Sequence, residues 1–112
     1  MKIGKNVGFA QIEPDYVLPE AIEIGDNSAF GWQVKLLTHE FTQDSQRFGK
    51  IKIGKNVLIG AFSAIRGGVK IGDNSIVAMC SFVNKDIPSN ELWGGVPAKK
   101  LKKLKNKRIS HP

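Results

Sequence analysis

The stretch of sequence that decides the fold runs from Ile53 to Asn74 and reads IGKNVLIGAFSAIRGGVKIGDN. It begins and ends on one pattern, an aliphatic residue, Gly, a charged residue and Asn, so the copy at Ile53 is repeated at Ile71. Earlier copies of the pattern begin at Ile3 and Ile24. Aliphatic residues also recur every six positions, at Ile53, Ile59, Ile65, Ile71, Val77 and Val83. Four positions after each of these comes a small or β-branched residue, at Val57, Ser63, Val69, Ser75, Ser81 and Ile87.

The spacing of six residues predicts β-structure. Six is a multiple of the strand period of two and not of the helical period of about 3.6, so only extended chain keeps these residues on one face. Three short strands, each one hexad long, make one triangular coil, and stacked coils bury a continuous apolar prism. The Asn and Gly of the repeated pattern tolerate left-handed backbone at the turns. The alternative, a small antiparallel sandwich, does not require strict hexads.

Length and composition restrict the number of domains, the cellular location and the kinds of metal site that we expect. A chain of 112 residues forms one domain, and 41% hydrophobic with 24% charged residues is typical of a globular protein. No apolar run approaches the roughly 20 residues that span a bilayer, and the N-terminus lacks a signal-peptide pattern, so we expect a cytoplasmic protein. Cys80 is the only cysteine, with His39 and His111 the only histidines, so one chain supplies few metal ligands.

The net charge of +7 is confined to the C-terminal tail. All ten acidic residues and ten of the 17 basic ones precede Lys99, so residues 1–98 are neutral. Leu101 and Leu104 have helical spacing behind Pro97, which favours a first helical turn, so we expect a short basic helix over 98–108 that covers the last coil. The neutral body lacks a basic stripe with interleaved aromatic residues, which argues against nucleic acid as a partner.

Unequal spacing between the repeated patterns locates an insertion. The intervals between successive copies are 21, 29 and 18, so relative to the last of them the first carries three extra residues and the second carries eleven. The eleven fall in the polar segment 38–50, which has turn formers and no six-residue period. We expect this segment to be a loop extruded from the helix, and loops on rigid scaffolds often carry function. His39 lies at its root, and a neutral imidazole is a suitable general base.

These repeats resemble those of the hexapeptide-repeat transferases. From Ile51 to Leu101 the chain is similar to the acetyltransferases that modify maltose, galactosides, virginiamycin-type antibiotics and surface polysaccharides. The segments that carry the likeness are 57–61 (VLIGA), 68–75 (GVKIGDNS), 81–88 (SFVNKDIP) and 95–99 (GVPAK). The resemblance implies an all-β fold, with a left-handed parallel β-helix acyltransferase domain over 1–97, the loop 38–50 extruded from it, the basic α-helix 98–108 and a tail 109–112.

The resemblance also implies an activity and an assembly. The expected reaction moves an acetyl group from acetyl-CoA, a co-substrate, to a hydroxyl of a sugar or saccharide, with His39 as the catalytic base and no metal. By motif position, the residues expected to contact the donor are Ala61, Met79, Asn84, Lys85, Lys99 and Lys102. The family's site lies between the subunits of a homotrimer. In agreement with this, several aromatic residues fall outside the inward hexad positions or within the loop, namely Trp32, Phe41, Phe48 and Phe62.

Several alternatives remain open at the level of sequence. N-acetylation of an amino sugar needs the same donor and base, since a neutral His39 serves either nucleophile. A non-catalytic module that binds polyanions through the basic tail needs only the lysines. Glu40 either orients His39 or is a solvated surface carboxylate. Trp93 either stacks on the adenine of the donor or covers the last coil, and Met79 adds bulk where relatives have a small residue.

Overall fold

The computed structural model describes residues 2–14, 21–37, 39–41 and 46–104. These residues form short strands and turns, as the all-β prediction requires. In chain order the strands are β1 (Lys2–Ile3), β2 (Gly8–Pro14), β3 (Ile22–Ile24), β4 (Ala29–Leu37), β5 (His39–Phe41), β6 (Gln46–Phe48), β7 (Ile51–Ile53), β8 (Leu58–Ile59), β9 (Ala64–Arg66), β10 (Lys70–Ile71), β11 (Ile76–Val77), β12 (Phe82–Val83), β13 (Glu91–Gly95) and β14 (Ala98–Lys103).

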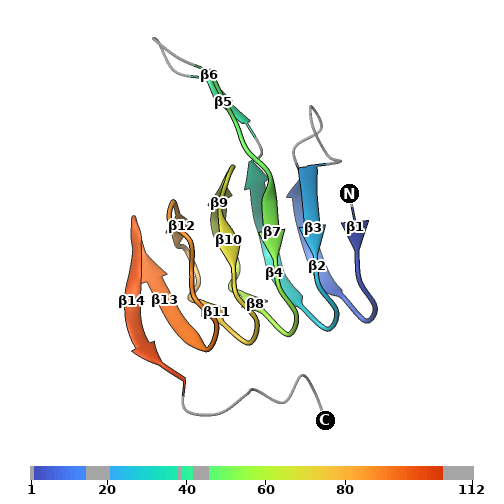
Figure 1. Ribbon diagram of the computed structural model, residues 1–112, viewed down its shortest axis with the longest axis vertical. Helices are drawn as coiled ribbons and strands as arrows, with labels where there is room; N and C mark the ends of the chain where they lie inside the picture. The colour runs from blue at the N-terminus through green and yellow to red at the C-terminus, as the bar shows by residue number, and fades with distance from the viewer. Residues whose placement is uncertain (1, 15–20, 38, 42–45, 105–112) are drawn as a thin grey trace.

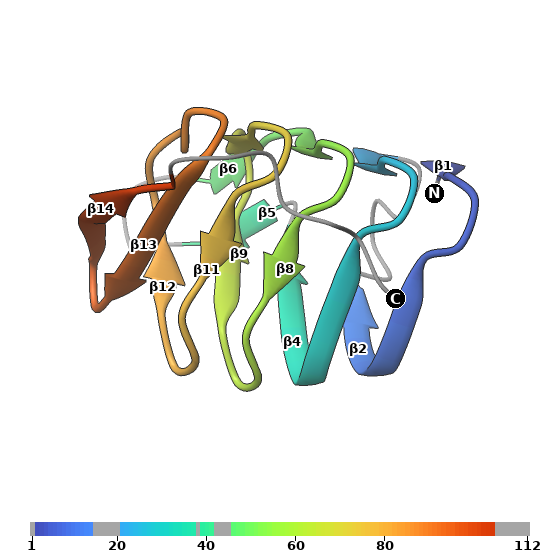
Figure 2. The ribbon, with the colours of Figure 1, turned by 90° about the horizontal axis from the view of Figure 1, so that it is seen from below.

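Parallel pairing between strands of successive coils makes the chain a β-helix with three faces (Figures 1 and 2). Face 1 contains β1, β3, β7 and β10, side by side in that order. Face 2 contains the first halves of β2 and β4, followed by β8, β11 and β13. Face 3 contains the second halves of β2 and β4, followed by β9 and β12. We call the turns from face 1 to 2, from 2 to 3 and from 3 to 1 the first, second and third corners.

The strand register reproduces the repeat spacing read from the sequence. On face 1, Lys2 pairs with Glu23, Glu23 with Lys52, and Lys52 with Lys70. These three steps along the chain equal the three intervals between the repeated patterns. The last coil is shorter, because the next partner of Ile71 is already Ile87. Each copy of the pattern therefore occupies the same place in its coil.

The two hexad series form the core, as the six-residue period predicts. Every member of both series is at most 3% exposed. Burial of an aliphatic side chain contributes about 1.5–3 kcal/mol relative to exposure, so the stacked column of isoleucines and valines is the main source of stability. Serines at inward positions are satisfied by the next coil: Ser28 Oγ donates to Gly54 O at 2.7 Å and accepts from Val57 N at 3.0 Å. The alternative antiparallel sandwich is excluded by this parallel stacking.

The Asn and the Gly of the repeated pattern have different tasks at the first corner. Asn56 and Asn74 have φ angles of 62° and 65°, the left-handed backbone that Asn tolerates. Their side chains also hydrogen-bond across coils, from Asn56 Nδ2 to Asn74 Oδ1 at 2.9 Å. The glycines here have no positive φ and are needed because coils approach closely: a Cβ on Gly25 would lie 2.6 Å from the carbonyl carbon of Gly54.

The predicted C-terminal helix is wrong over the residues that the structure describes. Residues Ala98–Lys103 form strand β14, antiparallel to β13, and 105–108 lie outside the described residues. Gly95, at φ 107°, begins the tight turn that brings Ala98 opposite Gly95 and Lys103 opposite Glu91. The edge of β13 supplies backbone partners that outweigh the helical spacing of Leu101 and Leu104, because tertiary pairing overrides weak local propensity. Within the described ranges, no helix has the length and apolar character to cross a membrane.

Candidate functional site

The extruded segment is where the sequence places it, at the third corner. Leu37 on β4 pairs with Arg66, and Lys52 pairs with Lys70, so the stretch from 37 to 52 is matched in the next coil by the much shorter stretch from 66 to 70. The difference leaves eleven residues outside the helix. Part of this excess forms an antiparallel hairpin of β5 and β6, which projects past the ends of the other strands (Figure 1). The prediction of an eleven-residue excursion within 38–50 is confirmed.

His39 is the first residue of this hairpin. Its backbone pairs with Phe48 on β6, two residues after β4 ends at Leu37. The side chain of His39 lies outside the described part of the structure, so its catalytic role stays a prediction. The returning end of the loop is fixed to the helix: Lys50 forms an ion pair with Glu23, and Gly68 N donates to Lys50 O at 3.1 Å. The loop root therefore has a defined place at the third corner.

Two of the predicted donor contacts, Ala61 and Met79, lie together at the second corner. Cys80 N donates to Ala61 O at 2.9 Å, which stacks the two turns directly on each other. Met79 is 68% exposed, so its bulk projects outward, as the departure from the usual small residue indicates. Trp32 and Phe62 lie at the same corner and are 50% and 56% exposed. We call Trp32, Phe62 and Met79 the apolar corner.

Asn84 and Lys85 lie at the third corner, in the turn that follows β12. Asn84 is half-buried, and its Oδ1 has no hydrogen-bond partner in the part of the chain that the structure describes. A buried acceptor without a partner costs about 1–3 kcal/mol, so this oxygen destabilises the turn. Lys85 is exposed beside it. These two residues share a corner with the loop that begins at His39.

Lys99 and Lys102 lie on strand β14 at the end of face 2. Lys99 is opposite Gly94 and Lys102 is opposite Leu92, which stand two residues apart on β13. Directly opposed residues of an antiparallel pair share a face, so both lysines lie on one side of the hairpin. The register shift between Leu92 and Trp93 makes this possible. Lys99 and Lys102 are separated by an odd number of positions, so in a regular strand they would lie on opposite sides. The strand thus presents them together, although the expected helix is absent.

The other side of the hairpin covers the end of the core with a cluster that sequence reasoning missed. Trp93 packs against the core residues, which settles its place as a cover of the last coil. Its Nε1 donates to Glu91 Oε1 at 2.9 Å, and Glu91 Oε2 is 3.4 Å from Lys100 Nζ. The side chain of Glu91 is only 12% exposed. The two-residue spacing of Glu91 and Trp93 is a strand signal that points to this arrangement once the turn after Gly95 is recognised.

The predicted site residues are therefore divided between corners of the prism. His39, Asn84 and Lys85 belong to the third corner, whereas Ala61 and Met79 belong to the second, and the two are separated by face 3. Lys99 and Lys102 lie at the end of face 2. Among the described residues, no group of three or more His, Cys, Asp or Glu side chains is placed to hold a metal ion.

Comparison with known proteins identifies the family. A family model described as "Bacterial transferase hexapeptide (six repeats)" matches residues 50–85. YvoF of Bacillus subtilis (strain 168) is 42% identical over 98 residues, which is 87% of this chain and 57% of YvoF. The chain belongs to the hexapeptide-repeat transferase family. The galactoside O-acetyltransferase of Escherichia coli (strain K12) is 35% identical to this hexapeptide-repeat chain over 116 residues, which is 97% of the chain and 56% of that enzyme.

Solved structures agree with the fold of this hexapeptide-repeat chain. The hexapeptide-repeat-containing acetyltransferase VCA0836 of Vibrio cholerae O1 biovar El Tor, crystallised with acetyl coenzyme A, superposes with a TM-score of 0.73 at 27% identity. The match covers 92% of this chain and 70% of that one. The left-handed parallel β-helix expected from the resemblance is confirmed. The chain spans slightly more than half the length of YvoF and of the galactoside enzyme, at 57% and 56%.

Glu91 makes the C-terminal hairpin of this hexapeptide-repeat chain sensitive to acid. The hydrogen bond from Trp93 and the charge of Lys100 hold the pKa of Glu91 below its ordinary value, against burial, which raises it. A carboxyl with a depressed folded pKa contributes stability above its unfolded pKa, and this stability is lost as the pH falls through the folded pKa. We expect the thermal midpoint to fall further in the wild type than in Glu91→Gln between about pH 7 and about pH 3. Identical pH dependence of the two midpoints would contradict the role of this carboxylate.

Proposed function

We propose that this protein transfers an acetyl group from acetyl-CoA to a hydroxyl of a sugar or saccharide, with His39 as general base at an interface between subunits. The observation that carries the proposal is the eleven-residue excursion at the third corner, which begins at His39 and interrupts an otherwise regular helix. The family relatives support it, because one is a galactoside O-acetyltransferase and another was crystallised with acetyl coenzyme A.

In the proposed reaction, the imidazole of His39 takes the proton of the acceptor hydroxyl as the hydroxyl oxygen attacks the thioester carbonyl carbon. The new C–O bond forms, the C–S bond then breaks, and the CoA thiolate leaves and takes up the proton held by the imidazole. A neutral imidazole suits this exchange because its ordinary pKa is about 6.5. A positioned base of this kind contributes about 10²- to 10⁴-fold to the rate.

The division of the candidate residues between two corners supports a site shared by two subunits. On one prism the second and third corners are separated by face 3, so one groove can use both only if the loop of one copy meets the second corner of another. The exposed apolar corner, with Trp32, Phe62 and Met79 each at least half exposed, offers the surface for such a contact. Three copies around one axis close this arrangement and give a finite assembly with three equivalent sites.

The donor, in this proposal, lies along the second corner of one subunit. Ala61 and Met79 border its pantetheine arm, while Lys99 and Lys102 face its phosphates from the outer side of β14. Asn84 and Lys85 contact the donor from the third corner of a neighbouring copy. A protein that draws acetyl-CoA from the cell's own pool belongs in the cytoplasm.

The lysines of β14 give a direct test of donor binding. We expect Lys99→Ala and Lys102→Ala each to weaken acetyl-CoA binding about 3- to 10-fold and to reduce its dependence on salt, because each removes a cation that faces a phosphate. Lys103→Ala is the matched control: it lies on the same strand opposite Glu91, on the other side of the hairpin, and should bind acetyl-CoA like the wild type. Calorimetry at two salt concentrations measures both quantities. Unchanged affinity in both variants would favour the polyanion-binding module instead.

The activity itself is tested by incubating the protein with acetyl-CoA and a panel of sugars and amino sugars while following the release of free thiol. Release that depends on a neutral sugar supports O-acetylation, and release that depends only on amino sugars supports N-acetylation. Mass spectrometry of the product places the acetyl group on oxygen or nitrogen. Thiol release with neither class of acceptor would count against the proposal.

A further inference from the structure

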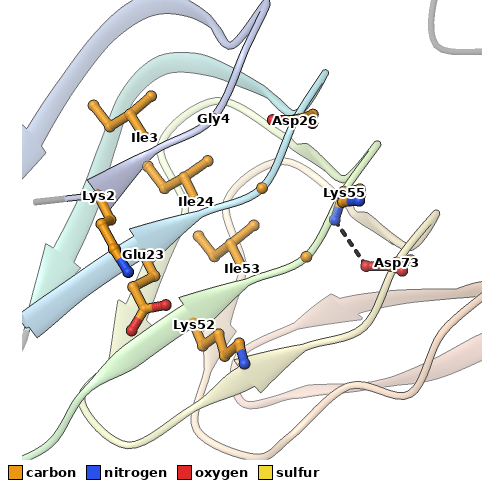
Figure 3. A pocket seen from close by; sticks show the side chains of 12 residues that line it. Lys2, Ile3, Gly4, Glu23, Ile24, Asp26, Lys52, Ile53, Lys55 and Asp73 are labelled. Atoms are coloured by element: carbon orange, nitrogen blue, oxygen red, sulfur yellow. Dashed lines mark hydrogen bonds between the residues drawn. The ribbon is translucent and has the colours of Figure 1, made fainter.

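The outer side of face 1 carries a trough that the proposed reaction does not use (Figure 3). Two adjoining hollows form it, with volumes of about 410 Å³ and about 430 Å³, and they share Lys52, Gly54 and Asp73. The trough follows the strands and turns of the first corner across successive coils, from β1 to the turn at Ser89. It lies on a different edge of the prism from the apolar corner, and it meets the root of the loop where Glu23 pairs with Lys50.

Glycines form the floor of this trough. In each coil an inward isoleucine precedes an outward glycine, and the glycines at Gly4, Gly25, Gly54 and Gly72 leave a strip without side chains. Only glycine fits, because a Cβ on Gly72 would lie 2.5 Å from Ser89 N. The backbone amides of the floor are already used between coils: Gly25 N donates to Ile53 O at 2.8 Å, for example. A peptide strand would therefore find no free backbone donors along the floor.

Four lysines project from the walls of the trough, and all four are exposed. They are Lys2, Lys52, Lys55 and Lys70. Within the described residues, none of their ammonium groups forms an ion pair. Each ammonium therefore keeps its donor capacity for a ligand.

Four carboxylates balance these lysines. They are Glu23, Asp26, Asp73 and Asp86. One oxygen of each aspartate accepts a backbone amide, from Lys5, Lys55 and Lys70, at 2.7, 2.8 and 2.9 Å respectively. The second oxygen of each aspartate has no hydrogen-bond partner among the residues that the structure describes. The aspartates are thus held in place by one oxygen, as Figure 3 shows for Asp73, and the other oxygen keeps its capacity to accept a hydrogen bond from a ligand.

The balance of charge and of hydrogen-bonding groups decides what fits. The charges of the four lysines and four carboxylates that line the trough cancel, and Glu23 also pairs with Lys50 beside it. A polyanion would therefore still meet the three aspartates, and a polycation would still meet the four lysines. A neutral chain of hydroxyl groups satisfies both, because each hydroxyl donates to a carboxylate and accepts from an ammonium. The repeat of these groups from coil to coil, about 4.8 Å apart, matches an extended ligand. We propose that the trough is a binding site for a neutral oligosaccharide.

The site stands apart from the proposed acetyl transfer. If second copies cover the apolar corner and the loop, the first corner stays open, because it is a different edge of the prism. The trough would then hold a saccharide chain on the surface whether or not that chain is the acceptor at His39. Binding in the trough can therefore be measured without any activity.

Calorimetry with maltohexaose and with cellohexaose tests the proposal on the full chain. We expect at least one of them to bind, and Lys52→Ala to weaken that binding about tenfold, since Lys52 borders both hollows and a hydrogen bond from a charged group is lost. Lys35→Ala on face 3 is the matched control, an exposed strand lysine outside the trough, and should keep the wild-type affinity. His39→Ala should also keep it, which separates this site from the reaction.

Amide NMR shifts show where the sugar binds. Shifts at Gly25 and Gly54 on adding the hexasaccharide support the trough, whereas shifts confined to the loop 39–48 would show binding at the candidate active site and overturn the proposal. Absence of heat and of shifts with both sugars would also overturn it. Tighter binding of a heparin-derived hexasaccharide than of either neutral sugar would replace it with a polyanion site.

Discussion

Replacement of His39 by alanine is expected to lower the turnover of acetyl transfer by about 10²- to 10⁴-fold, the range that a positioned general base contributes. Without the imidazole, the acceptor hydroxyl must lose its proton to water while its oxygen attacks the thioester. The chemical step therefore slows, whereas donor binding is unaffected. Alanine keeps the backbone pairing of His39 with Phe48. Thiol release with the acceptor found in the sugar panel measures turnover, and calorimetry measures acetyl-CoA affinity, which should hardly change.

Two controls separate a catalytic base from a structural residue. Glu40→Gln changes the neighbouring residue on β5, and because successive strand residues lie on opposite faces, we expect it to keep full turnover. The pH profile gives the second control: kcat/KM of the wild type should rise with pH as the imidazole loses its proton, and that of His39→Ala should not. Wild-type thiol release by His39→Ala would remove His39 from the mechanism.

The fold could be predicted because the residue pattern that specifies it is local in the sequence and is repeated from coil to coil. Ile59 and Ile65 are buried for the same reason, their place in a six-residue period, and the period itself excludes a helix. The C-terminal hairpin could not be predicted this way, because β14 depends on the free edge of β13 and on the turn after Gly95, while the residues Leu101 and Leu104 favour a helix by themselves. The local pattern therefore predicted a helix where pairing with β13 produces a strand.

The sequence predicted individual residues of the candidate site but not how these residues are arranged in space. The repeat spacing located the loop that begins at His39, and motif position located Ala61 and Met79, yet neither pattern shows that these residues lie on different corners. That division comes from the register of the coils, and it is the reason why we propose a site shared by two subunits. Glu91 and Trp93 were missed as a pair because their hydrogen bond depends on the same hairpin that the helical interpretation concealed.

Phe62→Asp is expected to dissociate the proposed trimer and thereby to abolish the activity. Phe62 is 56% exposed and has a φ of 63°, a left-handed backbone that bulky residues rarely adopt. Gln33 and Cys80, at the same turn of the neighbouring coils, are also left-handed, with φ angles of 53° and 59°, so the conformation belongs to the turn. In the proposed trimer, the exposed phenyl ring is what a neighbouring subunit covers. Asp tolerates left-handed backbone better than Phe, so the substitution spares the fold while placing a charge in the contact. Loss of an aromatic anchor at an interface costs up to about 4 kcal/mol, or about 10³-fold in affinity.

Light scattering, which gives the mass of the assembly, and thiol release, which gives the turnover, test this prediction on the same samples. The wild type should have three times the 12.3 kDa mass of the chain and full activity, whereas Phe62→Asp should have the mass of one chain and turnover near background. Lys5→Asp introduces the same side chain at an exposed position of the first corner, where no subunit contact is proposed, and should change neither the mass nor the turnover. A cooperative thermal transition in Phe62→Asp would show that the chain is still folded, so that the lost activity comes from lost assembly. A fully active species of 12.3 kDa would refute both the trimer and the shared site, because one prism cannot bring its second and third corners into one groove.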